Sequence, residues 1–182
     1  MTRHASDNAG DRAVGAKWEA RFQELANASG YTVTANQKNR SGAAVAVGGR
    51  NGGSRLVLPD MLVLGRPNQY HEIKHKNPTA YGSYGLEAYR FAHLLEIANQ
   101  TDDLVLYTIH DWHRAGATNS RADMENRLED WVTADVRLLQ FEPRKTFPGK
   151  TYVNGTCEIA DIHYWSADLW MPLSDFWAPV FA

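Results

Sequence analysis

Residues Leu58–Gly82, LPDMLVLGRPNQYHEIKHKNPTAYG, place charged side chains on two apolar segments that are separated by a turn. The runs Leu56–Leu64 and Tyr70–Lys74 predict two strands around the turn Gly-Arg-Pro-Asn. Charges are rare inside such strands, because an unpaired buried charge is costly and needs a partner or a metal. The charged residues of these strands therefore predict a site that holds a ligand.

Three of these residues, Asp60, Glu72 and Lys74, are expected to meet. Glu72 and Lys74 are two residues apart, so their side chains point to the same face of an extended chain. A hairpin would bring Asp60 of the preceding strand beside them. Two carboxylates can hold a hard cation such as Mg²⁺, and a lysine beside them can position a water and stabilise charge on a phosphate. The set predicts phosphodiester hydrolysis, with a structural ion-pair cluster as the alternative.

The composition indicates one folded domain with a positive segment in a slightly acidic chain. Hydrophobic residues make up 43% of the 182 residues, which argues against global disorder, and the net charge of −2 excludes a histone-like polycation. Seven Lys and Arg residues stand against two acids between Lys38 and Lys76. Such a segment can attract phosphates over short range. The single cysteine, Cys157, excludes an internal disulfide and a cysteine-rich zinc site.

The order of the elements predicts a mixed α/β sheet flanked by helices. Trp18, Phe22 and Leu25 recur at helical spacing and predict a helix over residues 14–29, after a flexible arm at residues 1–13. Further strands are expected at residues 31–35 and 104–109, and a helix at about 84–99. The glycine-rich stretch 39–55 is expected to be a loop or a weak hairpin. The resulting core spans residues 14–112 in the order helix, three strands, helix, strand.

Residues 113–182 are expected to form an α+β extension packed on this core. A capping box at Ser120–Asp123 predicts a helix that includes Trp131, and Val136–Phe141 predicts a strand. The turn Asn154-Gly155 between two β-rich runs predicts a hairpin. The tryptophan-rich C-terminal segment could form a dimer surface or cap the core, and capping is the more frequent outcome for such a run.

The motif residues resemble a known family. Pro59-Asp60 followed by Glu72-Ile73-Lys74 looks like the signature of the PD-(D/E)xK nucleases, the restriction-endonuclease-like superfamily. The stretch GAKWEARFQELANASGYTV, residues 15–33, is similar to the first helix of the Holliday-junction-resolvase-like branch, where a glycine precedes a helix with a catalytic glutamate. Asn39–Gly42 looks like the R-x-S-G type loop of that branch. The resemblance covers roughly residues 14–112 and implies a restriction-endonuclease-like core, with the order αβββαβ.

The resemblance also implies roles for individual residues. Asp60 and Glu72 would be metal ligands together with the backbone carbonyl of Ile73, Glu19 would join them directly or through water, and Lys74 would be the catalytic lysine. The implied metal is Mg²⁺, for which Mn²⁺ can substitute, and the implied partner is DNA, with a homodimer as one option. The expected DNA contacts are Lys38, Arg40, Ser41, Arg50, Arg55, Lys76 and Tyr84. On the helix after the lysine, where the family often has a glutamine, this chain offers Tyr84, Glu87 and Arg90.

The expected function is therefore a metal-dependent DNA endonuclease, acting on branched or otherwise structured DNA. A non-catalytic nucleic-acid-binding module on the same fold and an RNA-directed nuclease are the alternatives. No apolar run resembles a signal peptide or a membrane span, so a cytoplasmic protein without membrane contact is expected.

The sequence also raises two secondary hypotheses around this site. The tyrosines in the loop 77–84 could stack on splayed bases or simply pack in the loop. His71 and His75 are expected to face away from the carboxylates, because side chains alternate along a strand. His110 and His113 have no further ligand cluster in the sequence that would support a zinc site.

Overall fold

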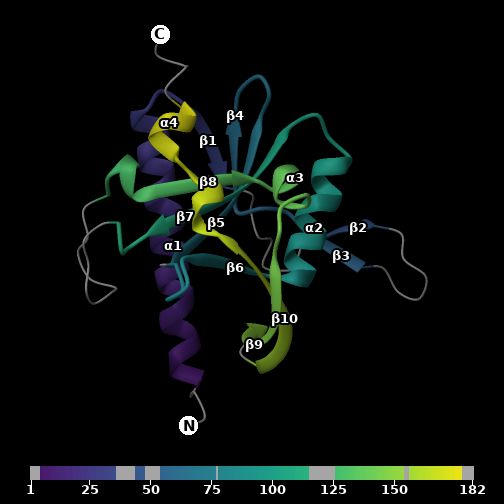
Figure 1. Cartoon of the computed structure of the whole chain (residues 1–182). Helices are drawn as coiled ribbons and strands as arrows, with labels where there is room; N and C mark the ends of the chain where they lie inside the picture. The colour runs from purple at the N-terminus through teal and green to yellow at the C-terminus, as the bar shows by residue number, and fades with distance from the viewer. Residues whose placement is uncertain are drawn as a thin grey trace.

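A six-stranded mixed sheet forms the centre of the molecule (Figure 1). The computed structural model of the chain describes residues 5–35, 44–47, 54–76, 78–114, 126–153 and 156–177. The strands, in their order across the sheet, are β1 (Thr32–Ala35), β4 (Met61–Leu64), β5 (Gln69–Lys76), β7 (Leu104–Asp111), β8 (Trp131–Asp135) and β11 (Met171–Pro172). Strands β5 and β7 are parallel, whereas the other neighbours are antiparallel. The mixed α/β class expected from the sequence is confirmed.

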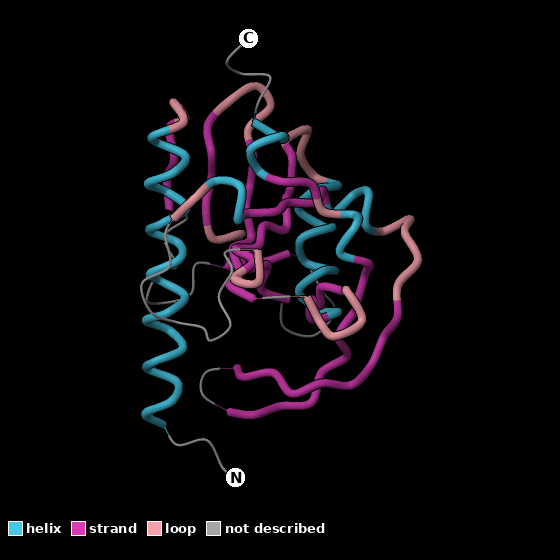
Figure 2. Tube along the Cα trace, turned by 60° about the vertical axis from the view of Figure 1, so that its left-hand side comes forward, coloured by secondary structure: helices cyan, strands magenta, loops and turns pink. Residues whose placement is uncertain are grey.

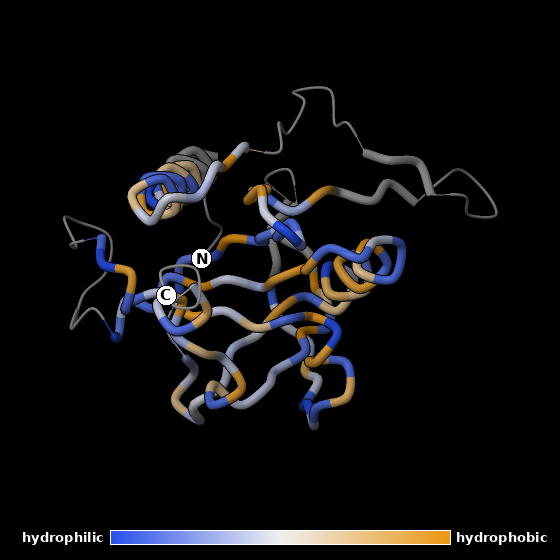
Figure 3. Tube along the Cα trace, turned by 90° about the horizontal axis from the view of Figure 1, so that it is seen from above, coloured by the Kyte–Doolittle hydropathy of each residue, from blue (hydrophilic) through white to orange (hydrophobic). Residues whose placement is uncertain are grey.

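Helices cover both faces of this sheet. They are α1 (Ala5–Ala28), α2 (Ala88–Asn99), α3 (Val136–Leu139) and α4 (Leu173–Trp177). Trp18 and Phe22 of α1 are buried with Trp177 of α4 on one face, and Phe91 of α2 is buried with Leu139 of α3 on the other. Seen from above, α1 and α2 flank the strands, and each helix is hydrophobic on only part of its circumference (Figure 3). The burial of each large apolar side chain contributes about 1.5–3 kcal/mol.

A smaller antiparallel sheet packs beside α2. Its strands are β6 (Ser83–Glu87), β10 (Thr156–Ser166) and β9 (Lys145–Val153), in the order β6-β10-β9. Trp165 of β10 contacts Phe91 of α2, with ring centroids 4.9 Å apart. The β9–β10 ribbon extends beyond the central sheet at the lower end of the molecule (Figure 2). Together, β6 and α2 supply the crossover connection that the parallel strands β5 and β7 require.

Two predicted hairpins are confirmed at the level of the backbone. Strands β2 (Ala44–Val47) and β3 (Ser54–Val57) pair antiparallel within the glycine-rich stretch. Strand β9 pairs with β10 up to Val153 and Thr156, the residues that flank the Asn154-Gly155 turn. The two turn residues themselves lie outside the described residues. The C-terminal tryptophans cap the core, since Trp165, Trp170 and Trp177 are 1%, 4% and 1% exposed.

Two elements of the C-terminal extension were predicted wrongly. Val136–Leu139 is the helix α3, not a strand, because the Asp135 carboxylate caps the helix by accepting a hydrogen bond from the Arg137 N–H at 2.8 Å. Trp131 begins β8 after the short 3₁₀ turn Leu128–Asp130, whereas a helix was expected there. Its ring is fully buried under α1, and this tertiary packing overrides the local helical pattern. The expected capping box at 120–123 lies outside the described residues.

Three boundaries in the core also differ from the prediction. Tyr84 lies in β6, because that segment pairs with β10, and the helix begins only at Ala88. The expected strand over residues 56–64 is divided at Pro59, which has no N–H for a sheet ladder, into β3 and β4. The first helix extends back to Ala5, through most of the expected arm. Among the described residues, no helix is both long and apolar enough to cross a membrane.

Candidate active site

The Asp60 carboxylate is fixed beside strand β5 by a hydrogen bond between strands. Asp60 directly precedes β4, and its Oδ2 accepts a hydrogen bond from the Ile73 backbone N–H at 2.8 Å. This bond holds Asp60 next to the segment that carries Glu72 and Lys74. Asp60 and Glu72 are 4% and 3% exposed, so both carboxylates are removed from bulk water. The structure therefore brings together the three residues that the strand pattern predicted.

The Glu72 carboxylate lies between two cations. Lys74 Nζ donates to Oε1 at 2.6 Å, and Arg90 Nη2 donates to Oε2. Burial alone would raise the pKa of the Glu72 carboxyl, but the charges of Lys74 and Arg90 outweigh it and lower the pKa to about 2. Glu72 is thus ionised at neutral pH although it is almost completely buried.

Lys74 is the more exposed partner in this cluster. Its side chain is 35% exposed, against 10% for the Arg90 side chain. Burial lowers the pKa of the Lys74 ammonium, but the neighbouring carboxylates of Glu72 and Asp60 more than compensate and raise it. Lys74 is therefore a permanent cation at the open side of the cluster.

Lys76, two residues further along the same face of β5, is in a different environment. Its ammonium donates to the Gly85 carbonyl of β6 and lies 5.3 Å from the centroid of the Tyr107 ring. Burial is the main reason that the pKa of Lys76 falls to about 8. The sequence predicted Lys76 as a DNA contact, whereas the structure turns its ammonium onto the protein backbone.

Arg90 is the member of the cluster to which sequence reasoning gave no role. It lies in the first turn of α2, is 8% exposed, and also donates to the Leu58 carbonyl at 3.2 Å. The buried carboxylate of Glu72 raises the pKa of Arg90 further, against the effect of burial. An arginine in an otherwise apolar helical stripe, next to Phe91, is the signal that could have identified it.

Glu19 and the Ile73 side chain both belong to the α1 side of the sheet. Glu19 is half-buried on α1 beside Trp18, and Trp18 stacks on His75 and His110, on the face of the sheet opposite Glu72. Among the described residues, no three His, Cys, Asp or Glu side chains form a group that could hold a metal, so Glu19 is not grouped with Asp60 and Glu72. The Ile73 side chain is 5% exposed in the core under α1, and its N–H is bonded to Asp60.

Tyr84 is a core residue, which corrects its prediction as a DNA contact. It is 2% exposed, and its hydroxyl donates to Asp111 Oδ2 at 2.6 Å. Its ring packs edge-on against Trp170, so it offers no face to a base. Lys38, Arg40, Ser41 and Arg50 lie outside the described residues, as does the side chain of Arg55 in β3.

The histidines of β5 face away from the carboxylates, as the alternation of side chains predicted. His71 is fully buried, and its Nδ1 lies 2.8 Å from the Thr108 hydroxyl. His75 Nδ1 lies 3.1 Å from His110 Nδ1. Burial lowers the pKa of both His71 and His110 to about 3, and the neighbouring His75 and Arg21 contribute at His110. The His71 and His110 rings are therefore neutral at physiological pH.

Comparisons with known proteins give a structural likeness but no match by sequence. No protein-family model matches the chain, and no curated protein matches it by sequence. A solved structure with a similar chain trace is that of Hjc, a Holliday junction resolvase from the archaeal hyperthermophile Archaeoglobus fulgidus. The two chains are 13% identical, the alignment covers 90% of this chain and 95% of that chain, and the TM-score is 0.47.

Proposed function

We propose that this protein is a metal-dependent endonuclease that hydrolyses phosphodiester bonds of structured DNA. The observation that carries the proposal is the cluster of Asp60, Glu72 and Lys74, in which two carboxylates and a lysine lie together although the carboxylates are almost fully buried. Buried ions are costly to maintain, and replacing them by apolar residues is often neutral or stabilising. A cluster of this kind is therefore better explained by chemistry than by stability.

The donor set fits a hard divalent cation. Asp60 and Glu72 offer carboxylate oxygens, the ligand type that Mg²⁺ prefers. Lys74 and Arg90 now neutralise the Glu72 carboxylate. Since Lys74 is the more exposed of the two, its ammonium is the group that can move aside and release Oε1 while Arg90 still holds Oε2. Ile73, through its carbonyl, and Glu19, through water, complete the proposed ligand set.

Each residue of the cluster has a distinct role in this proposal. A bound divalent cation would polarise the phosphoryl oxygen and acidify a water. Asp60 and Glu72 would hold that cation, and the Ile73 N–H fixes the orientation of the Asp60 carboxylate. Lys74 orients the attacking water and offsets the negative charge that develops on the phosphate. Arg90 holds Glu72 in its rotamer and acts as a positioning residue. The basic residues between Lys38 and Arg55 remain proposed contacts to the DNA backbone.

A cleavage assay tests the proposal directly. The protein is incubated with linear, circular, single-stranded and four-way-junction DNA, and with single-stranded RNA, in Mg²⁺, Mn²⁺ or EDTA. We expect cleavage of DNA that depends on the metal and is lost in EDTA. Asp60→Asn, Glu72→Gln and Lys74→Ala should each reduce the rate by at least ~100-fold, the usual cost of removing a group that stabilises transition-state charge.

Matched substitutions of exposed residues serve as controls. Asp161→Asn and Lys150→Ala change the same residue types outside the cluster and should cleave at wild-type rates. Wild-type cleavage by Lys74→Ala would refute the catalytic role of the cluster. Metal-independent DNA binding without cleavage would instead favour a non-catalytic binding module, and preferential cleavage of RNA would favour an RNA-directed nuclease.

A further inference from the structure

The small sheet β6-β10-β9 has one core face and one open face. Tyr84, Leu86 and Trp165 lie on the core face and are 1–2% exposed. Lys145, Phe147 and Tyr164 alternate with the core residues and lie on the open face, where Phe147 is 54% exposed. The solvated face of an antiparallel sheet is normally polar. The aromatic side chains on this face therefore call for a ligand.

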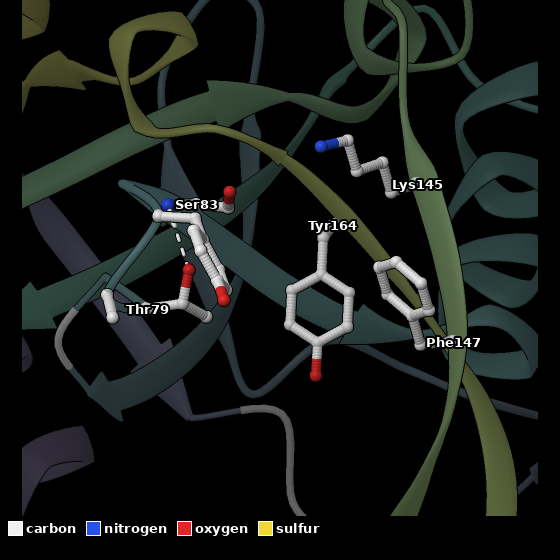
Figure 4. Close-up of a pocket in the computed structure, with 7 residues that line it drawn as sticks. Thr79, Ser83, Lys145, Phe147 and Tyr164 are labelled. Atoms are coloured by element: carbon white, nitrogen blue, oxygen red, sulfur yellow. Dashed lines mark hydrogen bonds between the residues drawn. The ribbon is translucent and has the colours of Figure 1, made fainter.

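These aromatics line a pocket of about 500 Å³ (Figure 4). This volume is within the range of ~300–1,000 Å³ for small-molecule sites. One wall is the turn before β6, with Thr79, Tyr81 and Ser83, and the other walls are Lys145, Phe147 and Tyr164. In Figure 4 the Tyr164 ring lies between the turn and Phe147, and the Lys145 side chain extends from β9 above these two rings. The pocket thus combines flat apolar rings, hydroxyl groups and one cation.

The turn that forms the first wall is held by its own hydrogen bonds. The backbone N–H groups of Thr79 and Gly82 donate to Ser83 and Thr79 carbonyls at 2.8 and 2.9 Å, and the Thr79 hydroxyl accepts from the Ser83 N–H at 3.3 Å. The Gly82 carbonyl accepts from the Ala167 N–H at 2.8 Å. Tyr81 is nevertheless 93% exposed. A large aromatic ring is thus presented to solvent on an ordered turn.

Gly85 connects this pocket to the candidate active site. A Cβ atom at Gly85 would come within 2.6 Å of the Tyr164 ring, so glycine is needed for this ring to lie flat on β6. The Gly85 carbonyl accepts hydrogen bonds from Lys76 Nζ and from the Tyr107 hydroxyl. Lys76 in turn is two residues from Lys74 on the same face of β5. Gly85 therefore contacts both Tyr164, which lines the pocket, and Lys76 of β5, the strand that carries Glu72 and Lys74.

We propose that this pocket binds an unpaired nucleobase of the DNA strand, next to the phosphate that is cleaved. The inference rests on the proposed function and names its substrate class: DNA with an unpaired nucleotide beside the cleavage site. Bases stack on aromatic side chains without sequence preference, and each stacked base strengthens binding roughly 5- to 150-fold. Tyr81, Phe147 and Tyr164 supply the stacking surfaces. Lys145, cross-strand neighbour of Tyr164, supplies the positive charge for the adjacent phosphate.

A fluorescence experiment tests the pocket without cleavage. The probe is a DNA duplex with 2-aminopurine at one unpaired position, compared with the same duplex in which 2-aminopurine is paired, both titrated in EDTA. We expect quenching and tighter binding for the unpaired probe. Tyr81→Ala and Phe147→Ala should each weaken that binding at least fivefold. Tyr81 is almost fully exposed, so its substitution tests the pocket without affecting the fold.

Two control variants match the substitutions in residue type. Phe141→Ala removes an aromatic side chain that is 81% exposed and lies outside the pocket, and it should bind both probes as the wild type does. Lys145→Ala should weaken binding, whereas Lys150→Ala should not. Lys150 is an odd number of residues from Lys145 along β9, so its side chain lies on the opposite face of the strand.

The outcomes separate this inference from the proposed function. Equal affinity for the two probes, or no difference in binding between Phe147→Ala and Phe141→Ala, would refute base binding in the pocket even if the protein cleaves DNA with Mg²⁺. Tighter binding of the unpaired probe than of the paired probe in EDTA, together with no cleavage in any metal, would support base binding in the pocket and refute the proposed nuclease activity. If the wild type sediments as a dimer and Tyr81→Ala as a monomer, and neither discriminates the probes, the open face is a contact between copies and the inference fails.

Discussion

The two faces of strand β5 bury polar side chains in opposite ways. On the face toward α2, Glu72 and Lys74 are charged and compensate each other with the help of Arg90. On the face toward α1, His71 and His75 are packed among aromatic rings, and the pKa of His71 is lowered to about 3. One face therefore maintains ions in the interior, and the other excludes charge.

This difference separates a site from a core. The neutral ring of His71 satisfies both its nitrogens locally, with Thr108 and Gln69, as buried polar groups usually do. The ionised cluster carries desolvation costs that a neutral core would avoid. The same strand, with the same burial, thus shows that the charges of the α2 face are not a requirement of the fold. Substitutions on each face test this contrast.

The largest effect on stability is expected from Arg90→Met on the charged face. The substitution keeps an unbranched side chain but leaves Glu72 with Lys74 as its remaining ionic partner. Breaking a buried ion pair costs about 3–5 kcal/mol, and the remaining lysine should limit the loss here to about 2–3 kcal/mol. Urea unfolding at pH 7 measures the change in the free energy of unfolding.

A double-mutant cycle shows whether the loss comes from the unpaired carboxylate. If it does, Glu72→Gln should recover most of the stability lost in Arg90→Met, because no charge is then left without compensation. Additive losses of stability in the double variant would mean that Arg90 stabilises the protein through packing and its bond to the Leu58 carbonyl. The burial of the Glu72 charge without Arg90 would then carry no measurable cost.

A smaller effect, on catalysis, is expected from Glu19→Gln on the α1 side. Trp18, the neighbour of Glu19, stacks on His75, so this turn of α1 lies over the end of β5 that carries Lys74. A carboxylate that acts through water, outside the group of direct ligands, typically contributes 10- to 100-fold to metal affinity or activity. We therefore expect a rate loss of about that size, with partial recovery at high Mn²⁺.

The matched control for Glu19 is Glu24→Gln, because Glu24 is an exposed glutamate of the same helix. It should cleave at the wild-type rate in both metals. A Glu19 variant that equals this control at low Mg²⁺ would remove Glu19 from the proposed ligand set, and a loss as large as that of Asp60→Asn would make it a direct ligand.

The sequence predicted the charged face because its signals are local. Glu72 and Lys74 share a face through the two-residue period of a strand, and Asp60 needs only a short hairpin to reach them. The alternation that placed Glu72 and Lys74 on one face also placed His71 and His75 on the opposite face. The expected mixed α/β architecture followed from the order of the elements in the same way.

The parts that the sequence did not predict depend on contacts between distant segments. Arg90 reaches Glu72 from another element, and its place in an apolar helical stripe indicates a buried arginine but not which carboxylate it pairs with. Strand β6 runs into α2 without a glycine or proline at the boundary, so Tyr84 was assigned to the helix. Its true position depends on pairing with Trp165, far along the chain. The pocket on the open face, built from three strands and a turn, could not be inferred for the same reason.

The smallest effect is expected on the neutral face, in the dependence of stability on pH. His71 Nε2 lies 3.2 Å from Gln69 Oε1, an acceptor, so the ring proton is on Nε2 and Nδ1 accepts from the Thr108 hydroxyl. Protonation would put a second donor and a charge into this network. The pKa of His71 is about 3 in the folded protein, against an ordinary value near 6.5 in the unfolded chain.

The sign of the pH effect follows from these pKa values. Between pH 6.5 and 3 the unfolded chain binds a proton at His71 that the folded protein does not, so stability falls as the pH falls, by about 2 kcal/mol between pH 7 and pH 5 for one such histidine. Glu72 behaves differently. Its pKa is lowered to about 2, so its contribution is complete above pH ~4.3 and is lost only as the pH falls toward 2. Acid destabilisation between pH 6.5 and 4.5 should therefore come mainly from His71 and His110, whose pKa values fall to about 3, with smaller contributions from His93 and His163.

His71→Phe tests this assignment, because the neighbours of His71 keep other partners. Thr108 remains bonded to the Thr133 hydroxyl at 2.9 Å, and Gln69 Oε1 still accepts from Trp177 Nε1 at 3.0 Å. Urea unfolding at pH 7 and pH 5 should show a pH dependence that is reduced by up to about half in this variant, since His110, and to a smaller extent His93 and His163, also have lowered pKa values and remain. An unchanged dependence in His71→Phe would show that the ring is already protonated in the folded protein, and the contrast between the two faces of β5 would not hold.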